Sequence, residues 1–256
     1  MDYAGEKSIA RKLVLQAGKL SLLGFGELLD SNLKKGNQDI VTKYDKQIEE
    51  FLREELEKEF PLIGFIGEEG GQQRKEKNWV IDPIDGTSYY ARGIGEYSVN
   101  LSLTQGEKTL FGFTYCPAQN ELYEAQINEG AFCNGRKITA STVGDFGQAM
   151  LSFGGIELQE KKTDLAILSL SKRVRCVRMG SCARELCLIA CGKVDLLVKQ
   201  KQSIWDFAAG KLILREANAE LTDFNGEKKW DWSGKNSNHL IASNKILHER
   251  FLKEFD

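Results

Sequence analysis

The chain has 256 residues, a net charge of −2 and 41% hydrophobic residues. This length suits one large domain or two modest ones, and the composition allows a substantial core. The balanced charge lacks the basic footprint of a nucleic-acid-binding protein, so no direct contact with nucleic acid is expected.

The first apolar segment has the pattern of a surface helix. Between Ile9 and Phe25 apolar positions recur at helical spacing, and charges such as Arg11 and Lys19 interrupt them. The segment predicts an amphipathic helix over 7–29 and neither a signal peptide nor a membrane span. The six cysteines contain no C-x-x-C pair, so we interpret them as small buried residues and not as a zinc site. We therefore expect a cytoplasmic protein without a membrane partner.

Patterning predicts a second helix over 45–60, which Pro61 ends. Short apolar segments then predict strands, and Asn134-Gly135 predicts the tight turn of a hairpin over 130–138. The other strands expected in this part are Ile63–Ile66, Trp79–Ile81, Ser98–Leu103, Leu110–Cys116 and Glu121–Ala125.

Beyond residue 143 the pattern changes to strands that alternate with helices. We therefore predict an α+β subdomain over 1–143 and an α/β subdomain over 144–256. The elements expected in the second half are Ala149–Phe153, Leu165–Lys172, Arg175–Arg178, Cys182–Cys191, Asp195–Val198 and Ile204–Ala217.

Two carboxylates, Asp82 and Asp85, follow the apolar strand that is expected at Trp79–Ile81. Charges at the exit of a core strand are costly to bury unless something compensates them. A divalent cation would do so, because carboxylates and a backbone carbonyl, here that of Ile84, are ligands that Mg²⁺ prefers. A purely structural turn is the less favoured interpretation, since the strand and Pro83 fix both acids.

Gly86 and Thr87 come directly after these acids. If they begin a helical turn, its free N–H groups face the same place and can bind a phosphate. Only two histidines are present, which argues against histidine-based acid–base catalysis. The combination points to metal-assisted phosphate chemistry.

Three further carboxylates near turns have ordinary alternatives. Glu68, in Gly67-Glu68-Glu69-Gly70, could be a solvated loop charge, and Asp45 could be an N-terminal helix charge. Asp206 stands three residues after Ser203, which is also the spacing of a helix capping box.

Taken together, these segments resemble the signature of the inositol monophosphatase family, over essentially the whole chain and in the expected order. The similar segments are Gly67–Glu69, Trp79–Thr87, Trp205–Gly210, Asp39–Asp45, Gly130–Gly135 and Gly180–Ala183. The resemblance implies an αβαβα layered sandwich of the inositol monophosphatase and fructose-1,6-bisphosphatase type, and a homodimer. It also implies Mg²⁺-dependent, lithium-sensitive hydrolysis of a small-molecule phosphate ester.

At matching positions, the resemblance implies a first metal ion held by Glu68, Asp82 and the Ile84 carbonyl. It implies a second ion held by Asp82, Asp85 and Asp206, and a third, weaker ion near Glu68. Two such ions would activate water and stabilise the attacking and leaving oxygens.

The resemblance also gives roles to residues beside the metals. Thr87, hydrogen-bonded to Asp45, is expected to orient the attacking water beside Glu68, and the N–H groups of Gly86 and Thr87 to receive the phosphate. The implied substrate-binding residues are Asp85, Gly86, Thr87, Gly180, Ser181, Cys182, Lys199 and Asp206.

Lys199 departs from the family pattern. It stands seven residues before Asp206, where the family usually carries a glutamate that binds a ring hydroxyl. Two interpretations stay open: Lys199 offers a cation to a second phosphate of the substrate, or it is a solvated loop lysine.

We therefore predict a phosphatase that acts on inositol-1-phosphate-like substrates. One alternative is fructose-1,6-bisphosphatase or 3′(2′),5′-bisphosphate nucleotidase activity. The other is a non-catalytic regulatory binding protein, since some family members interact with the transcription machinery.

Overall fold

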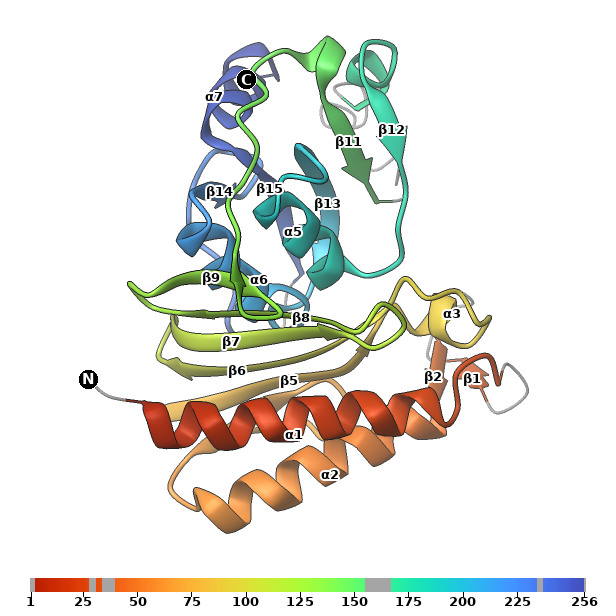
Figure 1. Ribbon diagram of the computed structural model, residues 1–256, viewed down its shortest axis with the longest axis vertical. Coiled ribbons are helices and arrows are strands. Elements are labelled where there is room, and N and C mark those ends of the chain that lie inside the picture. Colours follow the sequence, from red (N-terminus) through yellow and green to blue (C-terminus); the bar gives the residue numbers. More distant parts are fainter. Residues whose placement is uncertain (1–2, 28–30, 34–39, 155–166, 234–236, 256) are drawn as a thin grey trace.

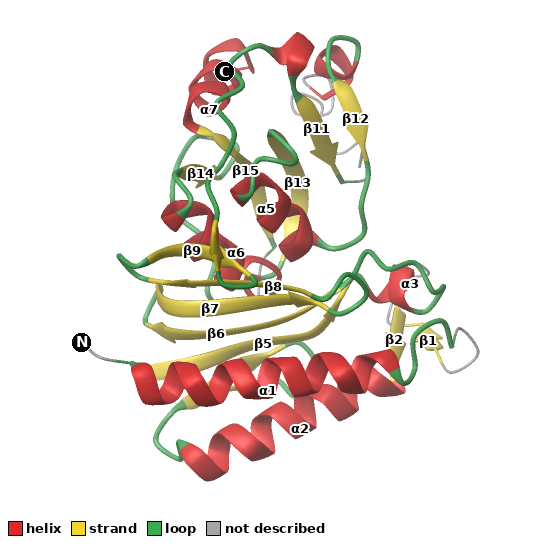
Figure 2. Ribbon diagram, in the orientation of Figure 1, coloured by secondary structure: helices red, strands yellow, loops and turns green. Residues whose placement is uncertain are grey.

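The computed structural model describes residues 3–27, 31–33, 40–154, 167–233 and 237–255. Within them, helices and sheets alternate in five layers: two helices, an eight-stranded sheet, two helices, a five-stranded sheet and a final helical layer (Figure 1, Figure 2). This is the αβαβα sandwich expected from the sequence, so the predicted fold class is confirmed.

The first layer consists of α1 (Ala4–Leu22) and α2 (Lys43–Glu59), which lie side by side against the large sheet (Figure 1). Their buried positions recur every three or four residues, as a helix with one apolar face requires. On α1 they include Ala10, Leu13, Val14 and Ala17, and on α2 Ile48, Leu52 and Leu56.

The helix expected over 7–29 is shorter than predicted at its C-terminal end, since α1 ends at Leu22. Gly24 and Gly26 follow, and Gly26 has a φ of 87°, a left-handed conformation that stops a helix. Residues 28 and 29 lie outside the described residues.

The large sheet has the order β10-β9-β8-β7-β6-β5-β3-β4, in which β3 and β5 pair in parallel and the other pairs are antiparallel. Asn134 and Gly135, with φ of 49° and 76°, form the predicted hairpin turn. The strands are β3 (Gly64–Gly67), β4 (Gln72–Gln73), β5 (Lys77–Asp85), β6 (Ser98–Gln105), β7 (Lys108–Cys116), β8 (Glu121–Gln126), β9 (Gly130–Cys133) and β10 (Arg136–Lys137).

Strand β5 runs past Ile81, where the sequence predicted its end, and includes both carboxylates. Side chains of a regular strand alternate between faces, so Asp82 and Asp85 would point in opposite directions. The pairing with β6 shifts between them: Asp82 stands opposite Asn100 and Asp85 opposite Ser98. The extra residue in β5 is a β-bulge, and it allows both acids to face the same side of the sheet.

The inner helices are α5 (Cys182–Ala190) and α6 (Ile204–Glu216), which lie between the two sheets (Figure 1). The small sheet has the order β12-β11-β13-β15-β14, with parallel β12-β11-β13 and antiparallel β13-β15-β14. Its strands are β11 (Met150–Phe153), β12 (Arg175–Val177), β13 (Leu196–Gln202), β14 (Ala219–Thr222) and β15 (Asn238–Asn244), and α7 (Lys245–Phe255) covers its outer face.

Alternating residues of β13 and β15 join three layers. Leu197 and Leu240 belong to the core that contains α5 and α6, whereas Val198 and Ile241 pack with Leu247 of α7. This alternation is that of a sheet with both faces covered.

Short elements complete the fold: β1 (Ser31–Leu33), β2 (Ile40–Thr42), α3 (Thr87–Tyr90) and a 3₁₀ turn at Phe146–Gln148. Of the helix expected at 165–172, residues 167–171 are helical, and 165 and 166 lie outside the described residues. The sequence reading missed β14, β15 and α7. The chain crosses from the large to the small sheet between β10 and β11, and the division into subdomains at 143/144 stays a prediction.

The structure bears on two expectations from the sequence, the lack of a membrane span and the burial of the cysteines. No helix among the described residues is long and apolar enough to cross a membrane. All six cysteines are free. Cys116, Cys182 and Cys187 are buried as expected, but Cys133 and Cys191 are only half-buried and Cys176 is exposed, so the expectation was wrong for these three.

His248 of α7 is buried between two hydroxyl groups of the small sheet. Its ring nitrogens lie 3.0 Å from Thr222 Oγ1 and 3.0 Å from Ser243 Oγ. Burial lowers the pKa of His248 from 6.5 to about 4.

This environment predicts pH-dependent stability. The unfolded chain protonates His248 below a pH of about 6.5, whereas the folded chain does so only below about 4. The free energy of unfolding therefore falls as the pH is lowered through this window, by up to ~3 kcal/mol at ~1.36 kcal/mol per pKa unit. We expect His248→Gln to flatten this part of the stability curve in urea denaturation, with His239→Gln as the matched control. Equal slopes in the wild type and His248→Gln would contradict the assignment.

Candidate active site

Asp82 is a buried acid at the junction between the sheets, with 1% of its surface exposed. Neither carboxylate oxygen has a hydrogen-bond partner within the described residues. Burial raises the pKa of Asp82 well above its usual value, and the nearby charges of Glu68, Asp85 and Asp206 raise it further. Such an acid is stable as an anion only beside a compensating cation.

Asp85, at the end of β5, ties the large sheet to α5. Its Oδ2 accepts hydrogen bonds of 2.7 Å from Ser181 Oγ and 2.7 Å from the Ala183 N–H. Ser181 also caps α5, because its Oγ accepts from the Arg184 N–H at 3.1 Å. Burial raises the pKa of Asp85, although these bonds oppose the shift.

Asp206 lies in the first turn of α6 and serves two purposes. Its Oδ2 accepts from the Ser203 N–H at 2.7 Å, so the capping interpretation was correct. Burial raises its pKa well above the usual value, and the charges of Asp85 and Glu68 act in the same direction. The capping acid therefore also belongs to the acidic cluster.

Glu68 follows β3 and is partly exposed. Its charge raises the pKa of both Asp82 and Asp206, so it lies within electrostatic reach of both. Glu68 is therefore part of the acidic cluster and not only a solvated loop charge.

Thr87 and Asp45 are brought together as the sequence led us to expect. Thr87 Oγ1 can donate to Asp45 Oδ1 at 3.2 Å and to the Ile84 carbonyl at 2.9 Å. Asp45 Oδ2 accepts from the N–H and the hydroxyl of Thr42, at 2.8 and 2.6 Å. Burial raises the pKa of Asp45 to about 6 even so.

Gly86 begins the short helix α3 with a φ of 93°, which favours glycine. A Cβ here would lie 2.8 Å from the Glu96 carbonyl oxygen and 3.3 Å from Ser181 Cβ. Gly180 is equally confined, because a Cβ on it would meet the Tyr89 ring at 2.1 Å. These close approaches join the turn after β5 to the segment before α5.

Cys182 and Lys199 are both buried beside these acids. Burial raises the pKa of the Cys182 thiol well above its usual value, so this side chain stays neutral in the core. Its backbone N–H is one of the groups that stabilise Asp85.

Lys199 is not a solvated loop lysine, and that interpretation was wrong. It lies in β13 with 6% of its surface exposed and forms an ion pair with the buried Glu185 of α5. Ser152 Oγ donates a hydrogen bond to the same carboxylate. Burial alone would lower the pKa of Lys199, but the charges around it, led by Glu185, raise it overall. Its charge also lowers the pKa values of Asp85 and Asp206.

Sequence reasoning missed Glu49, a buried acid of α2 that holds the loop carrying Glu68. Glu49 Oε2 accepts from the Glu69 N–H at 2.7 Å, and Oε1 accepts from the Gly70 N–H at 2.9 Å. Arg53, one turn along α2, donates its Nε–H to Glu49 Oε1 at 2.8 Å. The i, i+4 spacing of Glu49 and Arg53 was visible in the sequence, but it is also typical of an exposed helix face.

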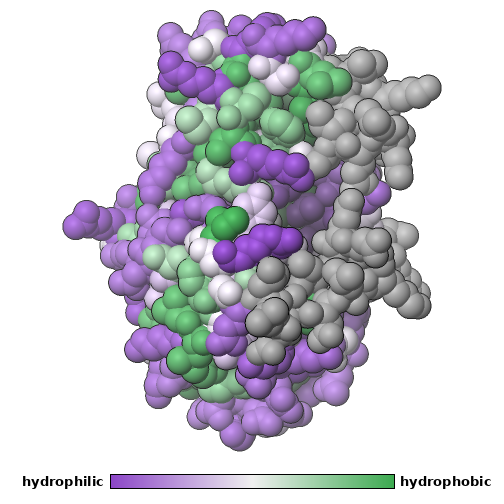
Figure 3. Space-filling view, turned by 90° about the vertical axis from the view of Figure 1, so that its right-hand side faces the viewer, coloured by the Kyte–Doolittle hydropathy of each residue, from purple (hydrophilic) through white to green (hydrophobic). Residues whose placement is uncertain are grey.

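The donor set suits a hard cation. Among the described residues, no group of three or more His, Cys, Asp or Glu side chains is arranged as a preformed metal site. Two observations support a site for such a cation: both oxygens of Asp82 lack a hydrogen-bond partner in the part of the chain that the structure describes, and the neighbouring acids offer only oxygen atoms as ligands. The face of the molecule that is turned to the viewer in Figure 3 carries both hydrophilic and hydrophobic residues.

The fold and the acidic cluster define the class of this protein: a layered αβαβα sandwich with an acidic, oxygen-rich site between its two sheets. The sequence model of the inositol monophosphatase family matches residues 5–256, and the chain belongs to that family. It is therefore a phosphatase, of a family that is generally metal-dependent.

Three relatives illustrate the match. The "Fructose-1,6-bisphosphatase/inositol-1-monophosphatase" of Thermotoga maritima is 31% identical over 243 residues, which cover 94% of this chain and 92% of the relative. The "Nus factor SuhB" of Xylella fastidiosa is 34% identical over 84% of this chain and 82% of its own. The solved structure of the extragenic suppressor protein suhB from Bartonella henselae superposes with a TM-score of 0.90 at 26% identity, covering 99% of both chains.

The buried charge of Asp82 predicts a conflict between stability and function. We expect Asp82→Asn to raise the free energy of unfolding in EDTA by ~0.5–2 kcal/mol, because the substitution removes repulsion within the acidic cluster. Asp195→Asn is the matched control: Asp195 is also buried, but it accepts from Ser141 Oγ at 2.5 Å and the Met150 N–H at 2.8 Å. That control should be destabilised, and an equal response of both variants in chemical denaturation would contradict the prediction.

The Glu49 contacts predict a positioning role. Glu49→Gln replaces an acceptor with an amide donor that faces the loop N–H groups, so the loop and Glu68 should shift. We expect the Mg²⁺ concentration for half-maximal phosphatase activity to rise by roughly 10-fold, the scale of outer-shell effects at metal sites. Glu50→Gln, at an exposed neighbouring position, is the control. A merely structural role would lower the Tm and leave the Mg²⁺ dependence as in the wild type.

Proposed function

We propose that this phosphatase hydrolyses inositol-1-phosphate-like monophosphates with the help of Mg²⁺. The observation that carries the proposal is the buried Asp82 carboxylate, whose oxygens have no hydrogen-bond partner within the described residues and face the charges of four other acids. Family membership supports it independently.

In this proposal, Glu68, Asp82 and the Ile84 carbonyl hold one ion, and Asp82, Asp85 and Asp206 hold a second. A third, weaker ion lies near Glu68. Bound Mg²⁺ would lower the pKa of water and neutralise charge that develops on the phosphate oxygens.

The chain itself positions the reactants. The Thr87 hydroxyl donates a hydrogen bond to Asp45, so that a lone pair of Thr87 Oγ1 is free to accept one from a water and orient it beside Glu68. The N–H groups of Gly86 and Thr87 receive the phosphate. Gly86 suits this role because the absence of a Cβ lets a ligand approach the backbone closely.

In this proposal, the segment that leads into α5 recognises the alcohol part of the substrate. We assign its contacts to Gly180, Ser181 and Cys182, the last through its backbone because its thiol is buried and neutral. Lys199 borders this region, but its charge is already compensated by Glu185. That pairing favours a monophosphate over a substrate with a second phosphate.

Bisphosphatase activity is the second candidate, and the double name of the Thermotoga maritima relative favours it. Regulatory binding is the third, favoured by relatives named Nus factor SuhB. A retained set of acidic residues weighs against a purely non-catalytic role. The homodimer and the cytoplasmic location stay predictions.

Steady-state kinetics with Mg²⁺ test the proposal. We expect the highest kcat/KM for inositol-1-phosphate among three substrates, the others being fructose-1,6-bisphosphate and 3′-phosphoadenosine-5′-phosphate. Asp82→Asn should lower kcat by roughly 10²-fold or more, since even outer-shell changes at metal sites cost 10–100-fold. Lithium should inhibit, and a preference for a bisphosphate would overturn the substrate assignment.

A double variant separates the two interpretations of the substrate. Lys199→Met with Glu185→Gln removes both buried charges together and leaves neither acid nor base unpaired. If Lys199 binds a second phosphate, this variant loses bisphosphate hydrolysis selectively. Under our proposal, it changes the activities on mono- and bisphosphates by similar factors.

A further inference from the structure

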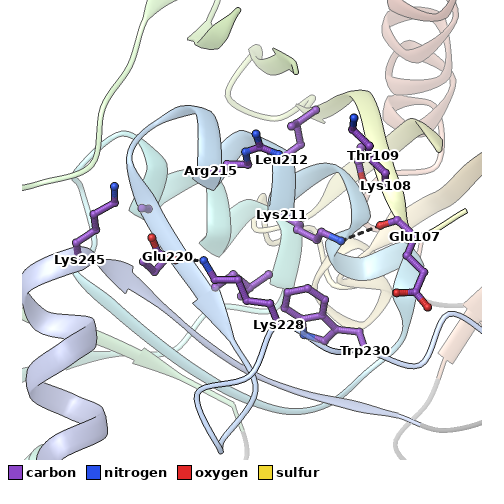
Figure 4. Close-up of a pocket in the computed structure, with 12 residues that line it drawn as sticks. Glu107, Lys108, Thr109, Lys211, Leu212, Arg215, Glu220, Lys228, Trp230 and Lys245 are labelled. Atoms are coloured by element: carbon purple, nitrogen blue, oxygen red, sulfur yellow. Dashed lines mark hydrogen bonds and ion pairs between the residues drawn. The ribbon is translucent and has the colours of Figure 1, made fainter. Parts of the chain in front are cut away.

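A cavity of about 570 Å³ lies along the C-terminal half of α6 (Figure 4). Four regions contribute to it: the turn before β7, the C-terminal half of α6, β14 with the loop that follows it, and the start of α7. The volume falls within the range of small-molecule sites, which is roughly 300–1,000 Å³.

Positive charge dominates the cavity wall. Its cationic residues are Lys108, Lys211, Arg215, Lys228 and Lys245. The acids are fewer: Glu220 is paired with Lys228, and the Glu107 carboxylate points away from Lys211 in Figure 4. Lys108 and Lys245 form no ion pair within the part of the chain that the structure describes.

Lys211 is held at the wall in a fixed position. Its Nζ lies 4.7 Å from the ring centroids of both Trp230 and Trp232 and donates to the Glu107 carbonyl at 3.0 Å. Burial, together with a smaller effect of the Arg215 charge, lowers the pKa of Lys211 to about 8, although the charge of Glu107 opposes the shift. A carbonyl and two rings compensate an ammonium only partly, so a bound anion would relieve this repulsion.

The helix geometry separates this cavity from the acidic cluster. An α-helix turns ~100° per residue, so Lys211 and Arg215 lie roughly 140° and 180° around α6 from Asp206. The two cations, four residues apart, share one face of the helix. The same helix therefore presents an acid to one site and two cations to another.

We propose that this cavity binds a small organic anion that carries at least two negative charges, with phosphate as the favoured charged group. Convergent lysine and arginine side chains recognise phosphate oxygens. The cavity exceeds the size of a phosphate ion, and Leu212, Leu221 and Trp230 offer apolar surface to the remainder of the ligand. The site requires no bound metal, unlike the acidic cluster.

ADP is a suitable probe, and isothermal titration of the full-length chain in EDTA measures its binding. Without metal the acidic cluster repels ADP, so saturable binding reports a site elsewhere. We expect one ADP per chain with a sub-millimolar Kd. Lys211→Met with Arg215→Gln should weaken binding by about tenfold or more, because both changes remove a charge that faces the ligand.

Two further variants make the result independent of folding defects and of net charge. Lys108→Gln with Lys245→Gln alters exposed side chains only and should also weaken ADP binding. Lys12→Gln with Lys19→Gln removes the same amount of charge from the exposed side of α1 and should bind ADP as the wild type does. The proposal is overturned if ADP shows no saturable binding at millimolar concentration, or if all variants bind it equally.

Discussion

The burial of negative charge between the two sheets is the constraint on which the rest of this structure depends. Several parts of the chain adapt to it. The bulge in β5 turns two acids to one side, and the N-termini of α5 and α6 direct backbone N–H groups at Asp85 and Asp206. The positive ends of the helix dipoles stabilise these carboxylates. Lys199 adds a buried cation from the small sheet. Neither oxygen of Asp82 receives a hydrogen bond within the described residues, so the protein itself compensates this carboxylate poorly.

The acidic cluster also joins the two halves of the chain. Asp45, Glu68, Asp82 and Asp85 come from the side of the large sheet. Lys199 comes from the small sheet, and Ser181 and Asp206 come from the N-termini of the two helices between the sheets. Any ligand that binds acids of both halves stabilises their contact by mass action. The loop with Glu68 is the most exposed part of this assembly, and the buried Glu49 fixes it from α2. The position of the loop that carries Glu68 thus depends on a buried acid of another element.

A feature of the fold or of the site could be predicted from the sequence where its signal is local, and could not where it depends on contacts between distant segments. The acids after β3 and at the end of β5 were predictable because a charge at the end of an apolar strand is a local signal. The bulge that turns Asp85 toward Asp82 was not, since strand periodicity alone places them on opposite faces. Lys199 was misread because the polar run from Lys199 to Gln202 looks like a loop, whereas pairing with β15 keeps it in β13. Its partner Glu185 comes from another element, so only the tertiary structure reveals the pair.

The Lys199–Glu185 ion pair changes what can be inferred about substrate specificity from the lysine at position 199. A lysine in place of the usual glutamate suggests a reversed charge beside the substrate alcohol. In the folded chain, Glu185 of α5 places a carboxylate beside Lys199, and Ser152 donates a hydrogen bond to that carboxylate. The net local charge of the pair is near zero, whereas a lone lysine would be positive. Because the field at the substrate depends on the sum of nearby charges and not on one residue, the substitution at position 199 is weaker evidence for a second phosphate than the sequence suggests.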